Sequence, residues 1–235
     1  MVIGNGMIAT RFGSYKDDER FVVFASGVSN STLNDLDSFV RELNLLKETI
    51  RKHPTAQLVY FSTCSIYDPA MQQSAYVLHK LTAEKLIQET HPNHIIFRVS
   101  NPIGKTDNRN TILNYFITHI CEGQHFTAWK YATRNLIDLD DMYAICDCIL
   151  QKQKHKNEII NVANPVNYSV ISIIHGIEQH FSKKADYSIV DRGSSPLIDI
   201  TAIEPVLSEL KLEFDEHYFA QLLTKYFPAN ELPVS

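Results

Sequence analysis

A tyrosine and a lysine four residues apart, Tyr76 and Lys80, have a spacing that could support proton transfer. They lie in the stretch SAYVLHK, and side chains at this spacing lie on one face of a helix. A lysine ammonium favours the phenolate form of a neighbouring tyrosine, whose pKa is ordinarily near ~10. Such a tyrosine can exchange a proton with a hydroxyl or carbonyl oxygen near neutral pH. Because this short motif also arises by chance, its surroundings must support it.

Polar side chains follow the apolar runs on either side of this pair. The run VYFST ends at Thr63, whose hydroxyl can donate and accept hydrogen bonds, and Cys64 and Ser65 come next. A strand end of this kind can equally feed an ordinary turn. Further along, FRVSNPIG places Asn101 after another run. Arg134 precedes the run NLIDL, where it can clamp a phosphate or pair with a neighbouring acid.

A glycine turn lies in the stretch IGNGMIA, at residues 3–9. Glycines between a strand and a helix let the backbone approach a dinucleotide's pyrophosphate, although they also serve a simple tight turn. The next apolar run, FVVFAS, ends at Ala25 and Ser26, and only residues 10–20 separate it from the turn. A βαβ crossover alone needs at least about 10–12 residues, so the connection is unusually short.

The elements that would position these residues alternate between strands and helices. The expected strands are 21–26, 57–63, 94–100, 135–139 and 158–164, and the expected helices are 33–53, 74–91, 111–123 and 140–153. This alternation predicts an α/β fold, a Rossmann-like doubly wound parallel sheet with helices on both faces. Ligands of such sheets bind beyond the carboxyl ends of the strands, where the polar residues above fall.

The pattern becomes mostly helical from about residue 165. We therefore expect a cofactor-binding domain over 1–164 and a small substrate-binding lobe over 165–235. Residues 101–133 are expected to contribute in part to the lobe.

Composition restricts the classes of function. The net charge is −5 and no basic stripe is present, so we expect no nucleic-acid partner. No stretch approaches the ~18–20 apolar residues of a membrane span, and no leader is apparent, so we expect a cytoplasmic protein without a membrane partner. The 4 cysteines and 10 histidines form no metal-binding motif, so we expect no metal and reduced thiols.

The order and spacing of these stretches resemble the extended short-chain dehydrogenase/reductase superfamily, specifically its NAD-dependent epimerase/dehydratase family of nucleotide-sugar enzymes. The resemblance covers most of the chain, and its pieces occur in the family's order. They are GNGMIA, VVFAS, LNLLKETI, VYFSTCSIYD, SAYVLHK, FRVSNPIG, TRNLIDLDDM, EIINVANPVNYSV and IDITAIEPVLSELKLEF. The resemblance implies NAD or NADP as cofactor and a nucleotide-linked sugar as substrate.

The resemblance also implies roles for individual residues. Tyr76 would be the general acid and base, Lys80 would assist it and hold the nicotinamide ribose, and Thr63 would orient the reacting sugar oxygen. The implied substrate contacts are Asn101, Arg134, Cys64 and Ser65. The implied cofactor contacts, besides Tyr76 and Lys80, are Gly4, Asn5, Gly6, Met7, Ile8, Ala25 and Ser26.

The sequence departs from the family in its first half. Family members usually carry a further glycine where Ile3 stands, and they place two more strands before the run that begins at residue 21. We therefore expect the second and third strands to be missing, together with the acidic residue that holds the adenosine ribose. The adenosine end of a cofactor would then be held weakly, or be held with help from a partner subunit.

The sequence also departs from the family near its predicted catalytic residues. Cys64 and Ser65 stand where the family's dehydratases carry an aspartate and a glutamate, which argues against dehydration. The loop between Thr63 and Tyr76 is short.

These observations predict an NAD(P)-dependent nucleotide-sugar epimerase or 4-keto-sugar reductase of surface polysaccharide biosynthesis. Weak cofactor binding favours the reductase, and the frequency of activities in the family favours the epimerase. The alternative is a catalytically silent member that senses a dinucleotide or binds a partner. The resemblance further implies a homodimer formed through helices 33–53 and 74–91.

Overall fold

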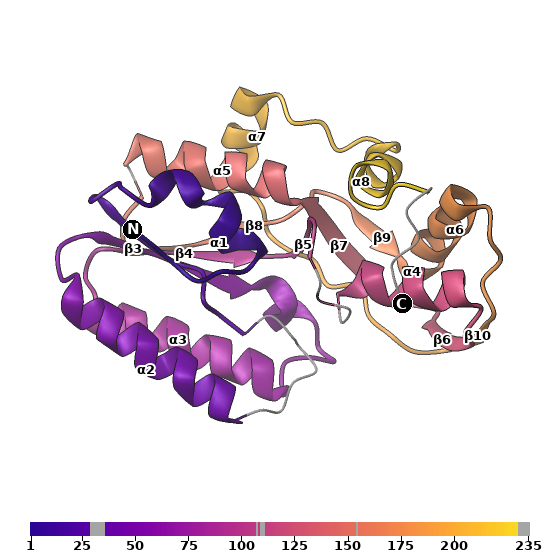
Figure 1. Ribbon diagram of the computed structural model, residues 1–235, viewed down its shortest axis with the longest axis horizontal. Coiled ribbons are helices and arrows are strands. Elements are labelled where there is room, and N and C mark those ends of the chain that lie inside the picture. Colours follow the sequence, from indigo (N-terminus) through magenta and orange to yellow (C-terminus); the bar gives the residue numbers. More distant parts are fainter. Residues whose placement is uncertain (29–35, 107, 109–110, 154, 230–235) are drawn as a thin grey trace.

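The computed structural model describes residues 1–28, 36–106, 108, 111–153 and 155–229. Its main sheet contains five parallel strands in the order β1-β2-β3-β4-β8 (Figure 1). They are β1 (Val2–Ile3), β2 (Phe21–Phe24), β3 (Gln57–Thr63), β4 (His94–Val99) and β8 (Glu158–Val162). Within the described ranges, no strand pairs with the outer edge of β1. The predicted Rossmann-like sheet without its second and third strands is confirmed.

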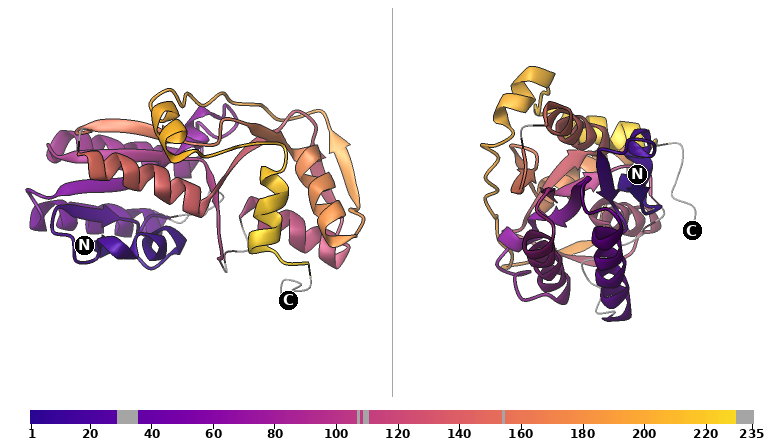
Figure 2. Two further views of the ribbon diagram at one scale, coloured as in Figure 1. Left: turned by 90° about the horizontal axis from the view of Figure 1, so that it is seen from above. Right: turned by 90° about the vertical axis from the view of Figure 1, so that its left-hand side faces the viewer.

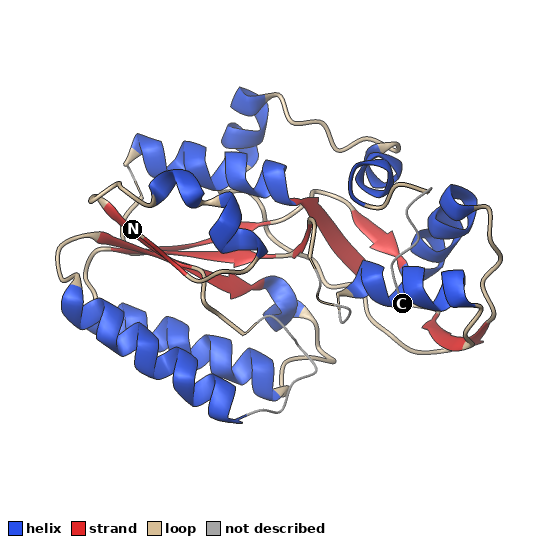
Figure 3. Cartoon of the chain, in the orientation of Figure 1, coloured by secondary structure: helices blue, strands red, loops and turns tan. Residues whose placement is uncertain are grey.

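Helices cover both faces of this sheet, as predicted (Figure 3). One face carries α1 (Met7–Arg11), α5 (Leu139–Lys152) and α7 (Glu204–Leu210). The opposite face carries α2 (Leu36–Lys52) and α3 (Ala75–Thr90), which lie side by side. Phe12 and Ile149 belong to the first core, while Leu46 and Ile87 belong to the second. Burial on both faces explains why the strands read as continuous apolar runs.

The two expected helices of the predicted dimer interface are present. The helix expected at 33–53 is described from Leu36 onward, and residues 33–35 lie outside the described residues. The helix expected at 74–91 is α3, which begins after Ser74, whose hydroxyl accepts a hydrogen bond from Val77 N at 3.2 Å. This N-cap fixes where the helix carrying Tyr76 starts.

The short connection at the start of the chain has an uncommon hand. The connections from β1 to β4 step from strand to neighbouring strand in one direction. α2 and α3 cross one face of the sheet, whereas α1 crosses the other (Figure 1). Two connections that step in the same direction but cross opposite faces of the sheet have opposite hands. About 98% of parallel crossovers are right-handed, as the connections through α2 and α3 are. The β1–α1–β2 connection is therefore left-handed. This geometry results if two strands beyond β1 are absent.

A second group of elements lies beside the main sheet (Figure 2). It contains two small sheets and three helices. The sheets are β5 (Asn101–Ile103), β7 (Thr133–Asp138) and β9 (Asn167–Ser169), and β6 (Phe126–Trp129) with β10 (Tyr187–Val190). The helices are α4 (Ile112–Glu122), α6 (Val170–Phe181) and α8 (Tyr218–Tyr226), and they share one apolar core.

The run expected as strand 135–139 forms β7 and lies in this second group, not in the main sheet as we predicted. The reason is β5, which follows β4 after the single residue Ser100 and pairs with β7. The domain division at residue 164 stays a prediction. Within the expected lobe, α7 packs against α5 on the main sheet. No helix in the described part of the chain is long and apolar enough to span a membrane.

Candidate active site

Tyr76 lies on the buried face of α3, near its start. The residue is 9% exposed, and its hydroxyl makes no hydrogen bond within the described residues. Lys80 lies one turn further along the same face, as the sequence predicts. Among the described residues the phenolic oxygen is therefore without a protein partner, as an oxygen that exchanges a proton with a substrate should be.

Thr63 is the last residue of β3, at the carboxyl edge of the sheet beside Val99 of β4. Its Oγ1 accepts a hydrogen bond from Ser65 N at 3.0 Å, which leaves the hydroxyl proton available to donate. Ser65 is half-buried and lies in the one-turn helix η2 (Cys64–Tyr67). Thr63 can therefore still act as a hydrogen-bond donor to a substrate oxygen.

Cys64 faces the protein interior. It is 5% exposed, and its Sγ donates to the Arg98 carbonyl oxygen at 3.1 Å. Burial raises the pKa of its thiol to about 12, so the sulfur stays protonated at neutral pH. A protonated thiol held by the backbone supports the strand end, and a direct substrate contact by Cys64 remains a prediction.

The Lys80 ammonium is held by protein groups. It donates to Glu42 Oε1 at 3.1 Å, to Tyr60 Oη at 3.2 Å and to the Phe61 carbonyl oxygen at 3.4 Å. The side chain is 3% exposed. The phenol to which Lys80 donates is that of Tyr60, and the predicted place of Lys80 beside the Tyr76 phenol stays a prediction. An ammonium has three donors, and all three are engaged.

Glu42, on α2, is the centre of this buried group. Its Oε1 accepts from Lys80 and from Tyr60 Oη at 2.8 Å, and its Oε2 accepts from Val28 N at 2.7 Å and bonds His79 Nε2 at 2.8 Å. Burial alone would raise the pKa of Glu42. The His79 bond and the Lys80 charge outweigh that effect and lower it to about 2. We call Glu42, Tyr60, His79 and Lys80 the Glu42 cluster.

The glycine turn lies against the loop that follows β2. Gly4 has a φ of +124°, and a Cβ there would lie 2.4 Å from the Ala25 carbonyl oxygen. This close approach requires glycine. Asn5 and Gly6 are exposed, and a Cβ on Gly6 would meet no atom of the described residues within 4 Å. The turn is therefore tightly packed at its first glycine and open at its second.

The other predicted cofactor residues extend this surface. Ser26 and Ile8 are half-buried, and Met7 lies against Gly104, where an added Cβ would be 2.7 Å from Met7 Sδ. The loop continues to Gly27, where an added Cβ would lie 2.4 Å from Lys80 Nζ. The predicted cofactor residues therefore form one stretch from the glycine turn to the Glu42 cluster.

Arg134 lies on β7, and Asn101 lies on β5, the strand that pairs with β7. Asn101 Nδ2 donates to the Asn135 carbonyl oxygen at 2.8 Å, and Arg134 Nη1 donates to the Thr133 carbonyl oxygen at 2.8 Å. Burial lowers the pKa of the Arg134 guanidinium, and the Asp68 charge opposes that shift. Arg134 forms no ion pair within 4.0 Å in the part of the chain that the structure describes. A half-buried cation without a paired carboxylate can take an anionic ligand.

Sequence reasoning missed Glu42, Tyr60, His79 and Ser100. A signal for Glu42 was present, because the buried stripe of α2 consists of Phe39, Glu42, Leu46 and Thr49. An acid on an apolar stripe calls for a buried partner. Ser100 Oγ, between β4 and β5, is buried and has no partner within the described residues.

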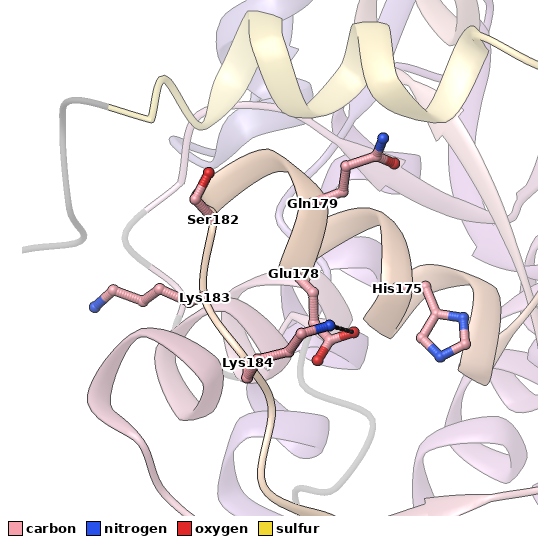
Figure 4. Close-up of a pocket in the computed structure, with 6 residues that line it drawn as sticks. All are labelled: His175, Glu178, Gln179, Ser182, Lys183 and Lys184. Carbon is pink, nitrogen blue, oxygen red and sulfur yellow. Dashed lines mark ion pairs between the residues drawn. The ribbon is translucent and has the colours of Figure 1, made fainter.

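Two surface hollows lie away from this site. One runs along α6 and is lined by His175, Glu178, Gln179, Ser182, Lys183 and Lys184 (Figure 4). There Lys184 and Glu178 form a surface ion pair at 3.8 Å. The second is lined by residues of α5, α8, the segment between α7 and α8, and the last residue of β7. Neither contains a predicted site residue. Among the described residues, no group of His, Cys, Asp or Glu could hold a metal ion.

A parallel sheet, a glycine turn and a Tyr-x-x-x-Lys helix at its carboxyl edge define a Rossmann-type domain of the short-chain dehydrogenase/reductase class. The sequence model of the NAD dependent epimerase/dehydratase family matches residues 23–163. The chain belongs to this family. No curated protein sequence matches it.

Solved structures resemble the fold closely. One is a UDP-glucuronic acid 4-epimerase from Bacillus cereus in complex with UDP-glucuronic acid and NAD, with a TM-score of 0.69, 18% identity, and coverage of 94% of this chain and 78% of that one. A second is a UDP-N-acetylglucosamine 4-epimerase from Methanobrevibacter ruminantium, with a TM-score of 0.68, 18% identity, and coverage of 94% and 80%. A third is a dTDP-glucose 4,6-dehydratase from Bacillus anthracis in complex with NAD, with a TM-score of 0.66, 18% identity, and coverage of 93% and 77%. At these identities, the likeness shows a shared fold.

Proposed function

We propose that the protein is a cytoplasmic NAD(P)-dependent enzyme that epimerises or reduces a nucleotide-linked sugar in surface polysaccharide biosynthesis. One observation carries the proposal. Thr63 and Tyr76 lie at the carboxyl edge of a sheet whose glycine turn opens at Gly6, and in the described ranges the Thr63 hydroxyl proton and the Tyr76 hydroxyl have no hydrogen-bond partner. Ligands of this fold bind at that edge.

The chain's own residues can handle the proton and the orientation of the sugar. Thr63 would donate a hydrogen bond to the reacting sugar oxygen. Tyr76 would give its proton to that oxygen as a ketone is reduced, or take it from the hydroxyl as an alcohol is oxidised. A bound nicotinamide nucleotide would supply or accept the hydride. The pair of residues therefore fits a reversible exchange between an alcohol and a ketone.

The residues present fit a dinucleotide unevenly. Gly4 and Gly6 form a turn whose second glycine faces open space, which suits a pyrophosphate. On the adenosine side, the two strands that usually flank such a site are absent from the described sheet. The nicotinamide side meets Lys80, whose donors are engaged. A reductase binds and releases its cofactor in each cycle, whereas an epimerase holds it throughout. Weak cofactor binding therefore favours a 4-keto-sugar reductase over an epimerase.

Arg134 is the residue that we propose holds the nucleotide diphosphate of the substrate. Changing Arg134 to methionine is expected to weaken UDP or dTDP binding about tenfold or more, because a charge-assisted hydrogen bond is lost. Lysine at this position should restore part of the affinity, and Arg51→Met on α2 serves as the control. Isothermal titration at two salt concentrations measures the effect. Equal affinity in Arg134→Met and in the unchanged protein would assign Arg134 to structure only.

A direct test of the function is to titrate the protein with NADH and with NADPH by fluorescence. The nucleotide that binds is then supplied with UDP- and dTDP-linked 4-keto sugars. We expect micromolar or weaker binding of one nucleotide, and turnover with at least one sugar. Failure to bind either nucleotide, in the monomer or in any oligomer, would rule the enzyme out.

A second candidate is a silent family member that senses a dinucleotide or binds a partner. Two observations favour it, the short first half and the engagement of Lys80 by Glu42. Binding of a nucleotide without turnover of any supplied sugar would favour it over the enzyme.

We also propose a homodimer through α2 and α3. The two helices lie side by side and expose Leu36 (71%), Val40 (55%), Leu78 (47%) and Leu81 (37%). Apolar side chains gathered on two adjacent helices are typical of an interface. We expect a dimer by light scattering at micromolar concentration, and a monomer after Leu36→Glu with Val40→Glu. The control Leu197→Glu, on an exposed loop residue, should stay dimeric. A monomeric unchanged protein would contradict the proposal.

A further inference from the structure

The Glu42 cluster places a carboxylate where the proposed function needs a free lysine. The Glu42 and Lys80 side chains are 1% and 3% exposed, so neither charge is screened by water. All three ammonium donors of Lys80 have protein acceptors, as described above. None is left for the two hydroxyls of a ribose.

The cluster also reaches the loop on which the cofactor would lie. Val28 N donates to Glu42 Oε2, and Gly27 packs so closely on Lys80 Nζ that an alanine there would displace the ammonium. His79 bonds the same carboxylate oxygen, Oε2, and stacks on Phe39, with ring centroids 4.5 Å apart. One carboxylate therefore links the loop after β2, the strand β3 through Tyr60, and the helix of Tyr76.

We propose that Glu42 is a positioning residue that withholds Lys80 from a bound nicotinamide nucleotide and thereby sets the nucleotide affinity. This inference rests on the proposed function. For Lys80 to donate to the ribose diol, the ammonium must exchange its bond to Glu42 for bonds to neutral hydroxyls. A buried Glu42 carboxylate that has lost its ammonium partner is unfavourable, so this exchange opposes nucleotide binding.

Glu42→Gln is the variant that tests this. Glutamine keeps the size of the side chain and can still accept a hydrogen bond, but it removes the charge that holds the ammonium. We expect the NADH Kd to fall at least about fivefold, measured by fluorescence titration. Lys80→Met should abolish this gain in the double variant, because the gain acts through the lysine. Glu42→Asp, which retracts the carboxylate, is the second variant if glutamine impairs folding, and it should tighten binding by a smaller factor.

Glu84→Gln is the matched control. Glu84 is another buried carboxylate; it pairs with Arg98 at 2.6 Å and forms no ion pair with Lys80 among the described residues. It should lose stability, but its NADH Kd should change less than twofold. A gain of affinity in both variants would show that loosening of the core, not release of the lysine, is responsible.

A readout without nucleotide follows the lysine itself. The ¹³Cε resonance of Lys80 is recorded at one pH in the unchanged protein and in Glu42→Gln. We expect its chemical shift to change in the variant, because the Lys80 ammonium loses its carboxylate partner. An unchanged chemical shift would overturn the pairing.

The outcomes separate this inference from the proposed function. If the unchanged protein binds NADH and Glu42→Gln binds it no more tightly, Glu42 does not withhold the lysine and the proposed function stands. If no variant binds NADH or NADPH, the proposed function fails, and this inference fails with it. Tighter binding in Glu42→Gln alone, with the changed Lys80 chemical shift, supports the inference.

Discussion

Replacing Tyr76 with phenylalanine is expected to lower turnover of a nucleotide-linked 4-keto sugar by about 10²- to 10⁴-fold, the usual contribution of general acid–base catalysis. The hydroxyl of Tyr76 makes no hydrogen bond within the described residues, so its removal leaves no protein group unpaired. The free energy of unfolding should therefore change by less than about 0.5 kcal/mol. Turnover is followed by the absorbance of NADH, and unfolding by urea titration.

The pattern of the loss distinguishes a proton donor from a binding contact. A proton donor affects kcat, whereas NADH affinity should stay within about twofold. Tyr115→Phe, at an exposed tyrosine of α4 outside the predicted site, is the control. If Tyr76→Phe turned over the sugar as fast as the control does, Tyr76 would not be the acid, whatever activity the protein has.

Gly4→Ala is expected to have the second large effect, on both folding and cofactor binding. The φ of +124° is unfavourable for alanine, and its Cβ would lie 2.4 Å from a backbone oxygen that cannot rotate away. Such strain costs about 1–3 kcal/mol and moves the turn itself. We expect NADH affinity to fall about tenfold or more, because a misplaced turn no longer presents its N–H groups to the pyrophosphate.

Gly6→Ala separates the two effects. Its Cβ would meet no atom of the part of the chain that the structure describes within 4 Å, so stability should change by less than about 1 kcal/mol. The added methyl group would enter the space proposed for the pyrophosphate, so NADH affinity should still fall. Gly13→Ala, which is equally open but lies outside the turn, should change neither property. Full NADH affinity in Gly6→Ala would mean that no phosphate lies at this turn.

The main sheet could be predicted from the sequence because its signals are local. Strands buried on both faces appear as unbroken apolar runs, and the short interval over residues 10–20 leaves no room for two strands. The second group of elements could not be predicted in the same way. β5 is three residues long and contains Pro102, so it carries no strand signal, yet it determines which sheet β7 joins.

The candidate site was predictable in its residues but not in their partners. The spacing of Tyr76 and Lys80 puts both on one helix face, and the structure has them there. The partner of Lys80 comes from α2, 38 residues earlier in the chain, and packing between helices decides it. Spacing along one helix carries no information about such a contact. The sequence therefore predicted the place of Lys80 on the helix but not its hydrogen bond to Glu42.

The place of β1 at the margin of the sheet has a consequence for association. In a complete doubly wound sheet the first strand is flanked on both sides, whereas here its outer backbone N–H and C=O groups are unpaired within the described part of the chain. An open margin of this kind is a template on which other chains can add a strand and aggregate. Because β1 contains only Val2 and Ile3, its open edge can form very few backbone hydrogen bonds with an added strand. Brevity is one of the devices by which proteins keep such edges harmless.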